Sequence, residues 1–534
     1  MKANPSDQKA RYFLALDLYN QGQITSAIEV LSLAPAKDFE YESAYLLGEL
    51  HLAANDLLQA AKSFDAALEV NETYEANFQL GLIFSHIQKY ENAEIYFEKA
   101  LKLNPDLVPA LINMGAIFRN IGKFTESLQR LDKALELDNA DPAAWLNKGV
   151  TLDSMGNLQD AIGCYEKALS LDGGYLEAYS NKGNAELGLG RLKEAHDSFQ
   201  KALRIFPGDA DTLSNYSVLK LAEANFSDGW RDYESRFYCS SRISNPFKKI
   251  PKLESLANLA DKKILVWAEQ GLGDTIQFYR YLENLSKFSQ HITLAVQSEL
   301  KELLAAQPLN IQVLNIGEVE AGGFDYQSAL MSLPYLFKTN IDTIPAEIPY
   351  IQVDDNKVSW WKQKIANHSG LKVGLVWSGG YKKDPNLWAM NERRNIPFSS
   401  YYPFSNIENI SYFCLQKGEG LQTPEYLEKN RYWTKNNFFD YTDLLNSFSD
   451  TAALIKNLDL VITVDTSMAH LSGALGKSVW ILNRFDSCWR WLKNTNLSPW
   501  YPTAKIYTQH EYQNWEKVIH EVQGDLTQLA KDGA

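Results

Sequence analysis

The first 240 residues repeat with a period of 33 or 34 residues, and this periodicity constrains the fold more than any other feature of the chain. Small residues recur at Ala15, Gly48, Gly81, Gly115, Gly149, Gly183 and Ser217. Twelve positions after each of them stands another small residue, at Ala27, Ala60, Ala93, Ser127, Ala161, Ala195 and Gly229. Two helices that cross closely need small side chains where their backbones approach. The sequence therefore predicts a stack of similar helix pairs.

A third column of small residues comes seven positions later, at Ala34, Ala67, Ala100, Ala134, Ala168 and Ala202. In two repeats a proline, Pro105 or Pro207, comes five residues after it and stops the second helix. This pattern resembles the tetratricopeptide repeat (TPR) family in seven consecutive copies, which implies an all-helical solenoid over residues 1–238. The seventh copy departs by carrying Arg236 at its third small position. We expect it to cap the stack and to dock it onto the C-terminal half of the chain.

Amide side chains share one register of the first helices, two residues before the first small position: Gln79, Asn113, Asn147, Asn181 and Asn215. Asparagine is a mediocre helix former, so four copies at one register need a reason. First helices of such repeats line the concave face, where a carboxamide can bond the backbone of an extended peptide. The alternative is that these amides bond between neighbouring helices. We expect a protein partner on the concave face, with a purely structural spacer as the alternative.

The second half of the chain alternates strand-like runs with amphipathic segments. The runs are ILVWAE, HITLAVQ, IQVLNI, FDYQSAL, KVGLVWSG, YFCLQKG, DLVITVD and SVWILN. This alternation predicts parallel sheets covered by helices on both faces. A linker rich in Ser, Pro and Lys is predicted at 239–260. Two Rossmann-like domains come after it, at 261–355 and 371–510, and a second linker at 356–370 joins them. A helix is expected over 511–534. The predicted fold is an all-α solenoid followed by an α/β module whose two domains face a cleft.

Three predicted strand ends carry candidate site residues, because ligands of open parallel sheets bind at the carboxyl ends of the strands. After ILVWAE, glycines at 271 and 273 allow a tight turn, and Asp274 begins a helix. After KVGLVWSG, two glycines let a backbone approach a ligand, and two arginines come next. After DLVITVD, two hydroxyl residues begin a helix that exposes free N–H groups, as a phosphate cradle would. The second and third sets are Gly379, Gly380, Arg393 and Arg394, and Asp465, Thr466, Ser467 and His470.

Each of these residues also has a purely structural interpretation. Asp274, Thr466 and Ser467 are suitable helix caps, the arginines could be a solvated pair, and a lone histidine more often serves packing than catalysis. The glycine turns complete no dinucleotide fingerprint, and no P-loop is present.

The same residues resemble a known enzyme family. The segment DTSMAHLSGALGKSVWIL resembles the DTGxxHLxxAxGxP signature of the heptosyltransferase-like glycosyltransferases (family 9), and QGLGDTIQF and ERRNIP resemble two further motifs of that family. The resemblance spans roughly residues 262–510, with Ser467 and Ser478 in place of the usual glycine and proline. Together with the repeats, it is similar to protein O-glycosyltransferases, including the O-GlcNAc transferases and bacterial flagellin glycosyltransferases.

This resemblance implies a GT-B fold and a set of roles. Asp274 matches the proposed general base, Arg394 or Arg393 the residue facing the donor phosphate, and the segment from Asp465 to His470 the donor cradle. From their position alone, after the strand YFCL, Gln416 and Lys417 are expected to approach the nucleotide.

The chemistry of glycosyl transfer agrees with these roles. An acceptor hydroxyl must lose its proton as it attacks, and a carboxylate at the mouth of a cleft can take that proton. Arginine, a helix N-terminus and hydroxyl donors can stabilise charge on the departing phosphate without a metal. The metal-dependent alternative normally uses an Asp-x-Asp pair, and the pair at Asp209 and Asp211 falls between repeat helices, where a cap is the better interpretation.

Composition limits the partners. A net charge of −14 leaves no broad basic surface for duplex nucleic acid. No secretory leader or membrane span is predicted, and the 4 cysteines and 8 histidines match no disulfide framework or metal motif. We therefore expect a cytoplasmic chain with reduced thiols, no nucleic-acid partner, no metal and no bound cofactor, only a nucleotide-sugar co-substrate.

The sequence leads to one functional hypothesis and two alternatives. The hypothesis is an inverting, metal-independent glycosyltransferase that moves a sugar from a nucleotide sugar to a Ser or Thr hydroxyl of a protein held by the repeats, for example flagellin. One alternative is a TPR adaptor whose transferase-like module is inactive. The other is a transferase directed at a glycan or lipid, with the repeats serving assembly.

Overall fold

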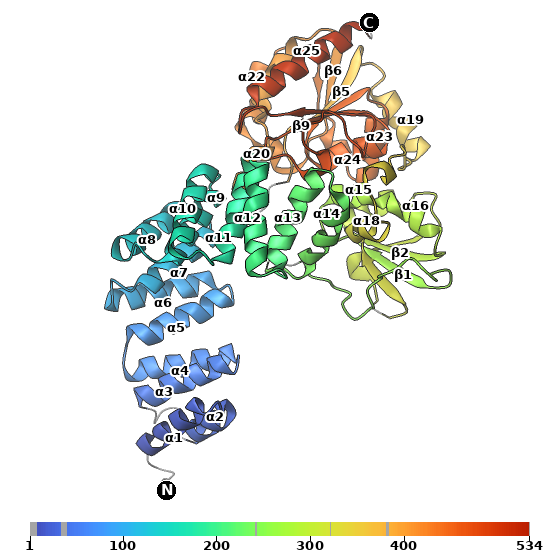
Figure 1. Cartoon of the computed structure of the whole chain (residues 1–534). Coiled ribbons are helices and arrows are strands. Elements are labelled where there is room, and N and C mark those ends of the chain that lie inside the picture. Colours follow the sequence, from blue (N-terminus) through green and yellow to red (C-terminus); the bar gives the residue numbers. More distant parts are fainter. Residues whose placement is uncertain (1–7, 34–39, 241–242, 321, 381–383, 533–534) are drawn as a thin grey trace. The chain divides into compact units, whose positions relative to one another are not determined.

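The computed structural model describes residues 8–33, 40–240, 243–320, 322–380 and 384–532 (Figure 1). The chain divides into two compact units. The first comprises Met1–Ala178 with Asp384–Leu387, and the second comprises Tyr179–Lys383 with Trp388–Ala534.

The first unit consists of helices that pair along the chain (Figure 1). They are α1 (Gln8–Asn20), α2 (Ile24–Ser32), α3 (Tyr41–Ala53), α4 (Leu57–Val70), α5 (Tyr74–His86), α6 (Tyr90–Leu103), α7 (Val108–Asn120), α8 (Phe124–Leu137), α9 (Pro142–Ser154) and α10 (Leu158–Leu171). The short helix η6 (Pro385–Leu387) packs on α7 and α9, and Ser154 Oγ donates to Asn386 Oδ1 at 3.3 Å.

The recurring glycines are explained by close contact between the two helices of a pair. A Cβ on Gly81 of α5 would lie 2.5 Å from the ring of Phe97 on α6, and one on Gly149 of α9 would lie 2.5 Å from the ring of Tyr165 on α10. Gly48 and Gly115 meet Phe64 and Leu131 in the same way. A side chain at these positions would overlap a buried neighbour. Of the predicted small positions, Ala34 lies outside the described residues.

The repeats continue into the second unit. Helix α11 (Leu176–Gly188) runs across the division, and α12 (Leu192–Ile205), α13 (Ala210–Ala222), α14 (Phe226–Tyr233) and η2 (Glu234–Phe237) come after it. Asp209 caps α13 by accepting from Thr212 N at 2.8 Å, as the sequence predicts. Trp230 of α14 packs edge-on against Phe278 and Trp489, which belong to the two halves of the α/β region.

The first α/β lobe holds a parallel sheet of order β3-β2-β1-β4. Its strands are β1 (Lys263–Trp267), β2 (His291–Val296), β3 (Gln312–Asn315) and β4 (Tyr326–Ala329). The accompanying helices are α15 (Leu272–Tyr279), α16 (Tyr281–Ser286), α17 (Ser298–Ala305) and α18 (Leu333–Leu336).

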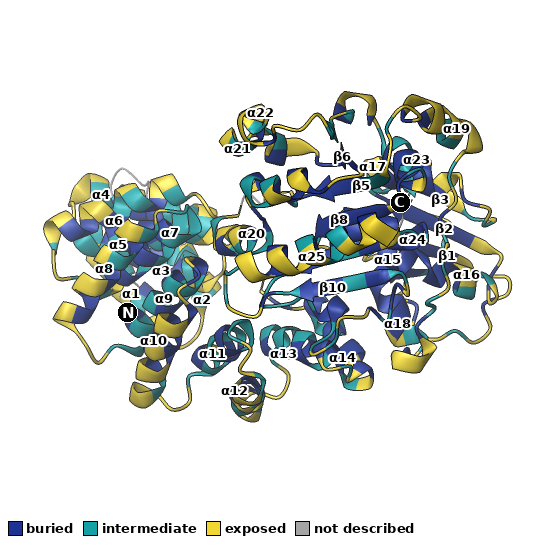
Figure 2. Ribbon diagram, turned by 90° about the horizontal axis from the view of Figure 1, so that it is seen from above, coloured by how far each residue is buried: buried dark blue, intermediate teal, exposed yellow. Residues whose placement is uncertain are grey.

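The second lobe holds a parallel sheet of order β10-β9-β8-β5-β6-β7. Its strands are β5 (Leu371–Val376), β6 (Ile410–Cys414), β7 (Phe438–Phe439), β8 (Leu460–Val464), β9 (Ser478–Asn483) and β10 (Ala504–Thr508). Its helices are α19 (Asp355–Lys364), α20 (Trp388–Arg394), α21 (Pro424–Leu427), α22 (Lys429–Tyr432), α23 (Phe448–Lys456), α24 (Ser467–Ala474) and α25 (Glu516–Asp532). The central strands β5 and β8 are buried (Figure 2), which explains their continuous apolar sequences.

The predicted strands are all present, and the described parts of the two segments predicted as linkers pack against the α/β region. In the segment 239–260, Leu253 N donates to Gln327 O at 2.8 Å, so this part runs beside β4, and Phe247 and Ile250 are buried. The segment 356–370 forms most of α19, which packs on α23 of the second lobe. Apolar side chains in both segments give them a core to join.

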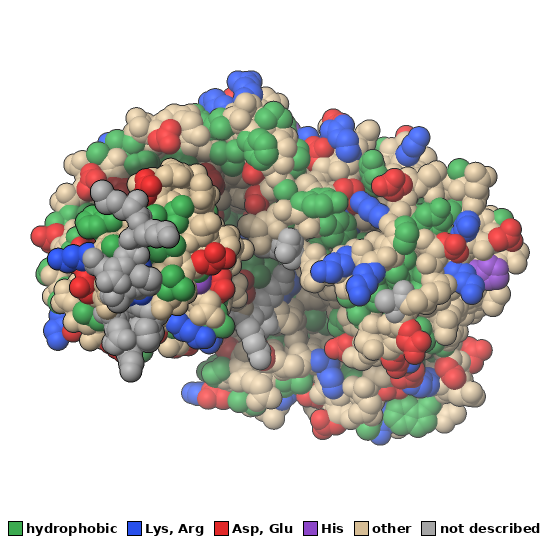
Figure 3. All heavy atoms as spheres, turned by 90° about the horizontal axis from the view of Figure 1, so that it is seen from below, with side chains coloured by type: hydrophobic (Ala, Val, Ile, Leu, Met, Phe, Trp, Pro, Cys, Tyr) green, Lys and Arg blue, Asp and Glu red, His purple; other side chains and the backbone are tan. Residues whose placement is uncertain are grey.

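The charged side chains of the surface are of both signs. On the face drawn in Figure 3, Lys and Arg are interspersed with Asp and Glu and form no continuous basic area. None of the described helices combines the length and the apolar character needed to cross a bilayer.

Candidate functional site between the two lobes

A cavity of about 1240 Å³ opens between the two lobes of the α/β region. In the first lobe its walls come from the segments that follow β1 and β2, and in the second lobe from those that follow β5, β6, β8 and β9. The carboxyl ends of both sheets therefore face one space. This is the edge at which open parallel sheets bind ligands.

In each lobe the order of the strands reverses at this cavity, although all the strands are parallel. Strand β1 lies between β2 and β4, and β5 lies between β6 and β8. At such a point the two connecting segments leave the sheet on opposite faces and leave a crevice between them. The turn after β1 and the turns after β5 and β8 line this crevice.

Most of the predicted site residues line the cavity together: Asp274, Gly379, Gly380, Arg394, Gln416, Lys417, Asp465, Thr466, Ser467 and His470. Arg393 does not line it. Its Nε lies 3.1 Å from Asp486 Oδ2, with only 13% of its side chain exposed, so it has a structural ion pair.

Asp274 is the third residue of α15, and both of its oxygens have partners. Oδ2 accepts from Gly271 N at 2.9 Å, so the carboxylate satisfies the backbone N–H of the N-cap residue at the helix start. Oδ1 pairs with the Arg490 guanidinium of the second lobe. Burial alone would lower the pKa of Arg490, but the charge of Asp274 raises it above its ordinary value. Asp274 is thus a helix cap and also an inter-lobe ion-pair partner at the cavity wall, with 19% of its side chain exposed.

His470 lies on α24, directly against α15. A Cβ on Gly273 would lie 2.7 Å from His470 Cδ2, so the glycine permits the two helices to meet. The imidazole stacks on Trp491 with ring centroids 5.2 Å apart, and its Nδ1 lies 3.0 Å from Tyr501 Oη. Burial, with Arg490 and Arg280 nearby, holds the pKa of His470 well below its usual value, so the ring is neutral.

A chain of hydroxyl groups selects the tautomer of His470. The shorter contact of Tyr350 Oη is with Ile276 O at 3.1 Å, and with its proton placed there Tyr350 accepts from Tyr501 Oη, which lies 3.3 Å away. Tyr501 then has no proton left for the histidine and accepts from Nδ1–H. The unprotonated Nε2 is left as an acceptor on the ring edge beside Gly273.

The start of α24 faces the cavity. Thr466 is the N-cap, and its side chain accepts from Met468 N at 3.2 Å. Thr466, Ser467 and Met468 all line the cavity, so the positive end of the helix dipole points into it.

Two arginines line the same cavity as this helix start. Arg394 lies over Gly379, where a Cβ would come within 2.6 Å of its guanidinium carbon, and its Nη2 donates to Gly380 O at 2.8 Å. Arg484, which comes directly after β9, lines the cavity and pairs with Asp486 at 3.2 Å. The sequence interpretation missed Arg484 and Arg490, although both lie in the segment RFDSCWRW directly after a predicted strand. That position was the signal that could have identified them.

Gln416 and Lys417 line the cavity, but their side chains are bonded within the protein. Gln416 Oε1 accepts from Trp377 N and Ser378 N at 3.1 and 2.9 Å, and its Nε2 donates to Ser378 O at 3.0 Å. Lys417 Nζ donates to Thr442 O at 2.8 Å. Gln416 therefore shapes the turn after β5, and the expectation that both approach a nucleotide remains a prediction.

Glu269 borders the cavity through its backbone, while its side chain is fully buried. Its Oε1 accepts from Arg236 Nη2 at 2.9 Å and from Met331 N at 3.1 Å. Burial raises the pKa of Glu269 to about 7, against the attraction of Arg236. Arg236 is the residue that marks the seventh repeat in the sequence, and this contact joins that repeat to the end of β1.

The predicted amides of the repeats make local bonds. Asn113 Nδ2 donates to Pro109 O at 2.8 Å and Asn147 Nδ2 to Ala143 O at 2.9 Å, each within its own helix. Gln79 bonds the Tyr45 hydroxyl of the preceding repeat. In the second unit, the two remaining amides are half-buried on α11 and α13, at Asn181 and Asn215.

The remaining candidates for redox or metal chemistry are the cysteines and clusters of metal-binding side chains. The cysteines at 164, 239, 414 and 488 are free thiols. Within the described ranges, no group of three or more His, Cys, Asp or Glu side chains is arranged to hold a metal ion.

Comparison with known families bears out the helical repeats. Residues 45–108 and residues 140–208 each match a family model described as tetratricopeptide repeat. These two stretches thus contain tetratricopeptide repeats, and the chain continues beyond them into an α/β region with two parallel sheets.

A curated relative extends beyond the repeats. The chain is 26% identical over 337 residues to Protein FlbA of Caulobacter vibrioides, a match that covers 59% of this chain and 54% of FlbA. The chain therefore spans about half the length of that relative.

Solved structures are also similar to part of this chain. One is a tetratricopeptide repeat protein from Parabacteroides merdae, with 18% identity, a TM-score of 0.40, and coverage of 45% of this chain and 94% of that one. Another is pilF of Pseudomonas aeruginosa, with 19% identity, a TM-score of 0.33, and coverage of 38% and 92%.

Proposed function

We propose that this chain is an inverting glycosyltransferase that moves a sugar from a nucleotide sugar to a Ser or Thr hydroxyl of a protein bound by the repeats. The observation that carries the proposal is the convergence of Asp274, the start of α24 and three arginines on one inter-lobe cavity. Each group suits one requirement of the reaction. The resemblance of the sequence to GT-B glycosyltransferases points the same way.

The second lobe supplies what a nucleotide diphosphate requires. Arg394 and Arg484 add positive charge to the cavity that the N-terminus of α24 faces, and Thr466 and Ser467 add hydroxyl donors. Such preorganised groups stabilise the charge that develops on the leaving phosphate, and arginine binds phosphate in a bidentate way. These residues can perform this role without a metal.

The first lobe supplies the proposed general base, Asp274. Its carboxylate is engaged by Arg490, which also lines the cavity. We infer that a bound diphosphate competes for Arg490. The carboxylate oxygen so released then accepts the proton of the attacking acceptor hydroxyl. His470 Nε2, an acceptor beside Gly273, is positioned to receive a hydroxyl of the donor.

Donor binding is the first test. A thermal-shift panel of UDP-, GDP-, ADP- and CMP-sugars should show one stabilising family, since a ligand at 100 times its Kd adds about 2.7 kcal/mol. Arg394→Ala should abolish that shift. A chain that responds to none of these donors would instead be an inactive adaptor.

Transfer is the second test. Candidate acceptors such as flagellin are co-expressed with the wild-type chain or with Asp274→Asn, and their intact masses are compared. Asp274→Asn should bind the donor yet lower the turnover rate about 100-fold or more, because it removes a general base. An equal mass increment with both chains would show that Asp274 is not the base.

A further inference from the structure

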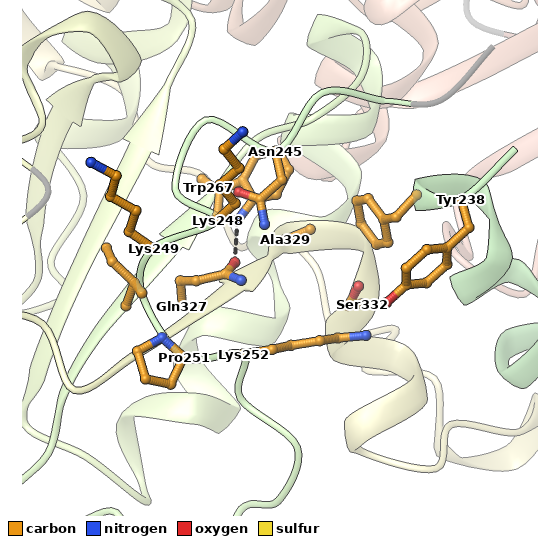
Figure 4. Close-up of a pocket in the computed structure, with 12 residues that line it drawn as sticks. Tyr238, Asn245, Lys248, Lys249, Pro251, Lys252, Trp267, Gln327, Ala329 and Ser332 are labelled. Atoms are coloured by element: carbon orange, nitrogen blue, oxygen red, sulfur yellow. Dashed lines mark hydrogen bonds between the residues drawn. The ribbon is translucent and has the colours of Figure 1, made fainter. Parts of the chain in front are cut away.

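A second cavity, of about 430 Å³, lies in the first lobe (Figure 4). We call it the linker cavity, because the segment 245–252 forms one wall where it runs beside β4. The opposite wall is one face of the sheet, with Trp267 of β1 and Ala329 of β4. A volume of this size falls in the range of small-molecule sites, roughly 300 to 1,000 Å³.

The linker cavity is distinct from the inter-lobe cavity. A buried group of polar side chains stands between them: Arg236 Nη2 donates both to Ser332 Oγ and to Glu269 Oε1, each at 2.9 Å. Ser332 lines the linker cavity and Glu269 borders the other one. Neither cavity shares a lining residue with the other.

Gln327 presents a hydrogen-bond donor at the floor of the linker cavity. Its Oε1 accepts from Trp267 Nε1 at 2.7 Å (Figure 4). An indole N–H can only donate, so the amide cannot be turned the other way. The NH₂ group therefore points into the cavity, where it has no partner among the described residues. Gln327 itself is 4% exposed, so this donor is recessed.

Asn245 repeats this arrangement on the opposite wall. Its Oδ1 accepts from Phe247 N at 2.8 Å, and a backbone N–H again can only donate. The NH₂ group of Asn245 is thus the half of the amide left for the cavity. Two fixed amides on facing walls offer donors and no acceptor.

Lysines complete this donor set. Lys248, Lys249 and Lys252 lie around the opening (Figure 4). Lys252 pairs with Glu234 at 2.8 Å, whereas Lys248 and Lys249 form no ion pair with any described residue. No acidic residue is among those that line the cavity in the described part of the chain. In a chain of net charge −14 this is a local reversal of sign.

We propose that the linker cavity binds a small organic anion, a carboxylate or a phosphate ester on an apolar body. The amide donors and lysines match the oxygens of the anion, because each can only donate. The rings of Phe237 and Trp267, with Ala329, receive the apolar part. A recessed floor favours a small molecule over the surface of a folded partner.

Calorimetric titration of the full chain tests this proposal with phenyl phosphate and benzoate as anionic probes and phenol as the neutral control. At least one anion should bind at concentrations up to about 10 mM, and phenol should bind at least tenfold more weakly. No binding of either anion would overturn the proposal.

Two variants locate the binding. Asn245→Asp keeps the acceptor for Phe247 N but replaces the NH₂ donor that faces the cavity by a negatively charged oxygen. It should weaken anion binding at least tenfold, because a hydrogen bond to the charged anion is lost and hydrogen bonds to charged groups are strong. Lys248→Glu/Lys249→Glu should act in the same direction. Lys287→Glu/Lys362→Glu makes the same change in net charge at two exposed lysines that line neither cavity, and it should leave the affinity unchanged.

Binding that persists in both linker-cavity variants but is lost in Arg394→Ala would place the anion in the inter-lobe cavity and would overturn the proposal. Binding of an acidic peptide in place of both small anions would overturn it as well, by making this surface a protein-docking site.

Discussion

Among single residues, His470 is the one whose burial should make the stability of the protein depend on pH. Because its pKa is held well below the ordinary 6.5, the folded chain leaves the ring neutral at a pH where the unfolded chain protonates it. The unfolded state then binds the extra proton, so the free energy of unfolding falls as the pH drops below about 6.5 and is unaffected above it. This protonation contributes a slope of about 1.4 kcal/mol per pH unit.

We therefore predict that His470→Asn flattens this acid-side dependence. Urea unfolding between about pH 5 and pH 7.5 measures it as the difference in slope between wild type and variant. His291→Asn, at an exposed histidine of β2, is the matched control and should keep the wild-type slope. A His470→Asn slope that equals that of wild type would mean that the buried ring is protonated in the folded chain.

The ion pair of Asp274 and Arg490 gives a second residue-level prediction. Arg490→Met leaves the Asp274 carboxylate at the cavity wall without its partner, so we expect a loss of about 3 kcal/mol in the free energy of unfolding. The double variant Asp274→Asn/Arg490→Met should recover part of that loss, because no charge is then stranded. Additive losses in this cycle, measured by urea unfolding, would show that the two side chains are not coupled.

The site residues were predictable where a sequence pattern marks a strand end. Glycine turns and helix-start residues identified Asp274, Gly379 and Thr466 in this way, and all three line one cavity. Arg490 also comes after a predicted strand, but no glycine turn or helix cap stands beside it, so its position after the strand was the only signal for it. For Gln416, the position after a predicted strand correctly placed the residue at the cavity. The sequence could not show that its amide already bonds the turn after β5, because that contact depends on the three-dimensional packing.

At the scale of elements, the helix pairs of the repeats depend on contacts between a glycine and a ring. Gly149 of α9 faces Tyr165, whereas a Cβ added to Gly163 of α10 would meet no atom within 4 Å. Gly149→Ala should therefore destabilise the chain by about 1–3 kcal/mol through overpacking. Gly163→Ala should stabilise it by roughly 0.5–1 kcal/mol, because alanine is the better helix former.

This matched pair is measured by thermal and urea unfolding of the full chain. Adding Tyr165→Leu to Gly149→Ala should restore part of the stability, since the smaller side chain leaves room for the new methyl group. Equal effects of the two single substitutions would show that helix propensity alone accounts for the recurring glycines.

Elements were predictable to the extent that their periodicity is visible in the sequence. The repeat spacing and the apolar runs identify the helix pairs and eight strands. Strand β7 has only two residues, Phe438–Phe439, and therefore has no pattern to find. The segment 245–252 was predicted as a linker from its composition, but Phe247 and Ile250 anchor it to the sheet. Composition does not show against which part of the fold an isolated apolar side chain packs.

For the whole molecule, the two compact units hold different parts of the proposed function: donor binding in one and acceptor binding in the other. All residues that line the inter-lobe cavity belong to the second unit, whereas Gln79, Asn113 and Asn147 belong to the first. A chain that lacks residues 1–178 should therefore keep the thermal shift with the donor but lose transfer to a protein acceptor. The amides of Asn113 and Asn147 bond their own helices through the NH₂ group, which leaves the carbonyl oxygen as an acceptor for a peptide N–H.

Asn113→Ala/Asn147→Ala in the full chain tests this division without a truncation. It should raise KM for the protein acceptor about tenfold, because two hydrogen bonds of roughly 0.7 kcal/mol each are lost. The values of kcat and of donor affinity should stay unchanged. Lys102→Ala/Lys133→Ala, at exposed lysines of α6 and α8, is the control. If the truncated chain glycosylates a free glycan or lipid as fast as the full chain does, the acceptor is recognised by the α/β region, and the repeats serve assembly instead of substrate binding.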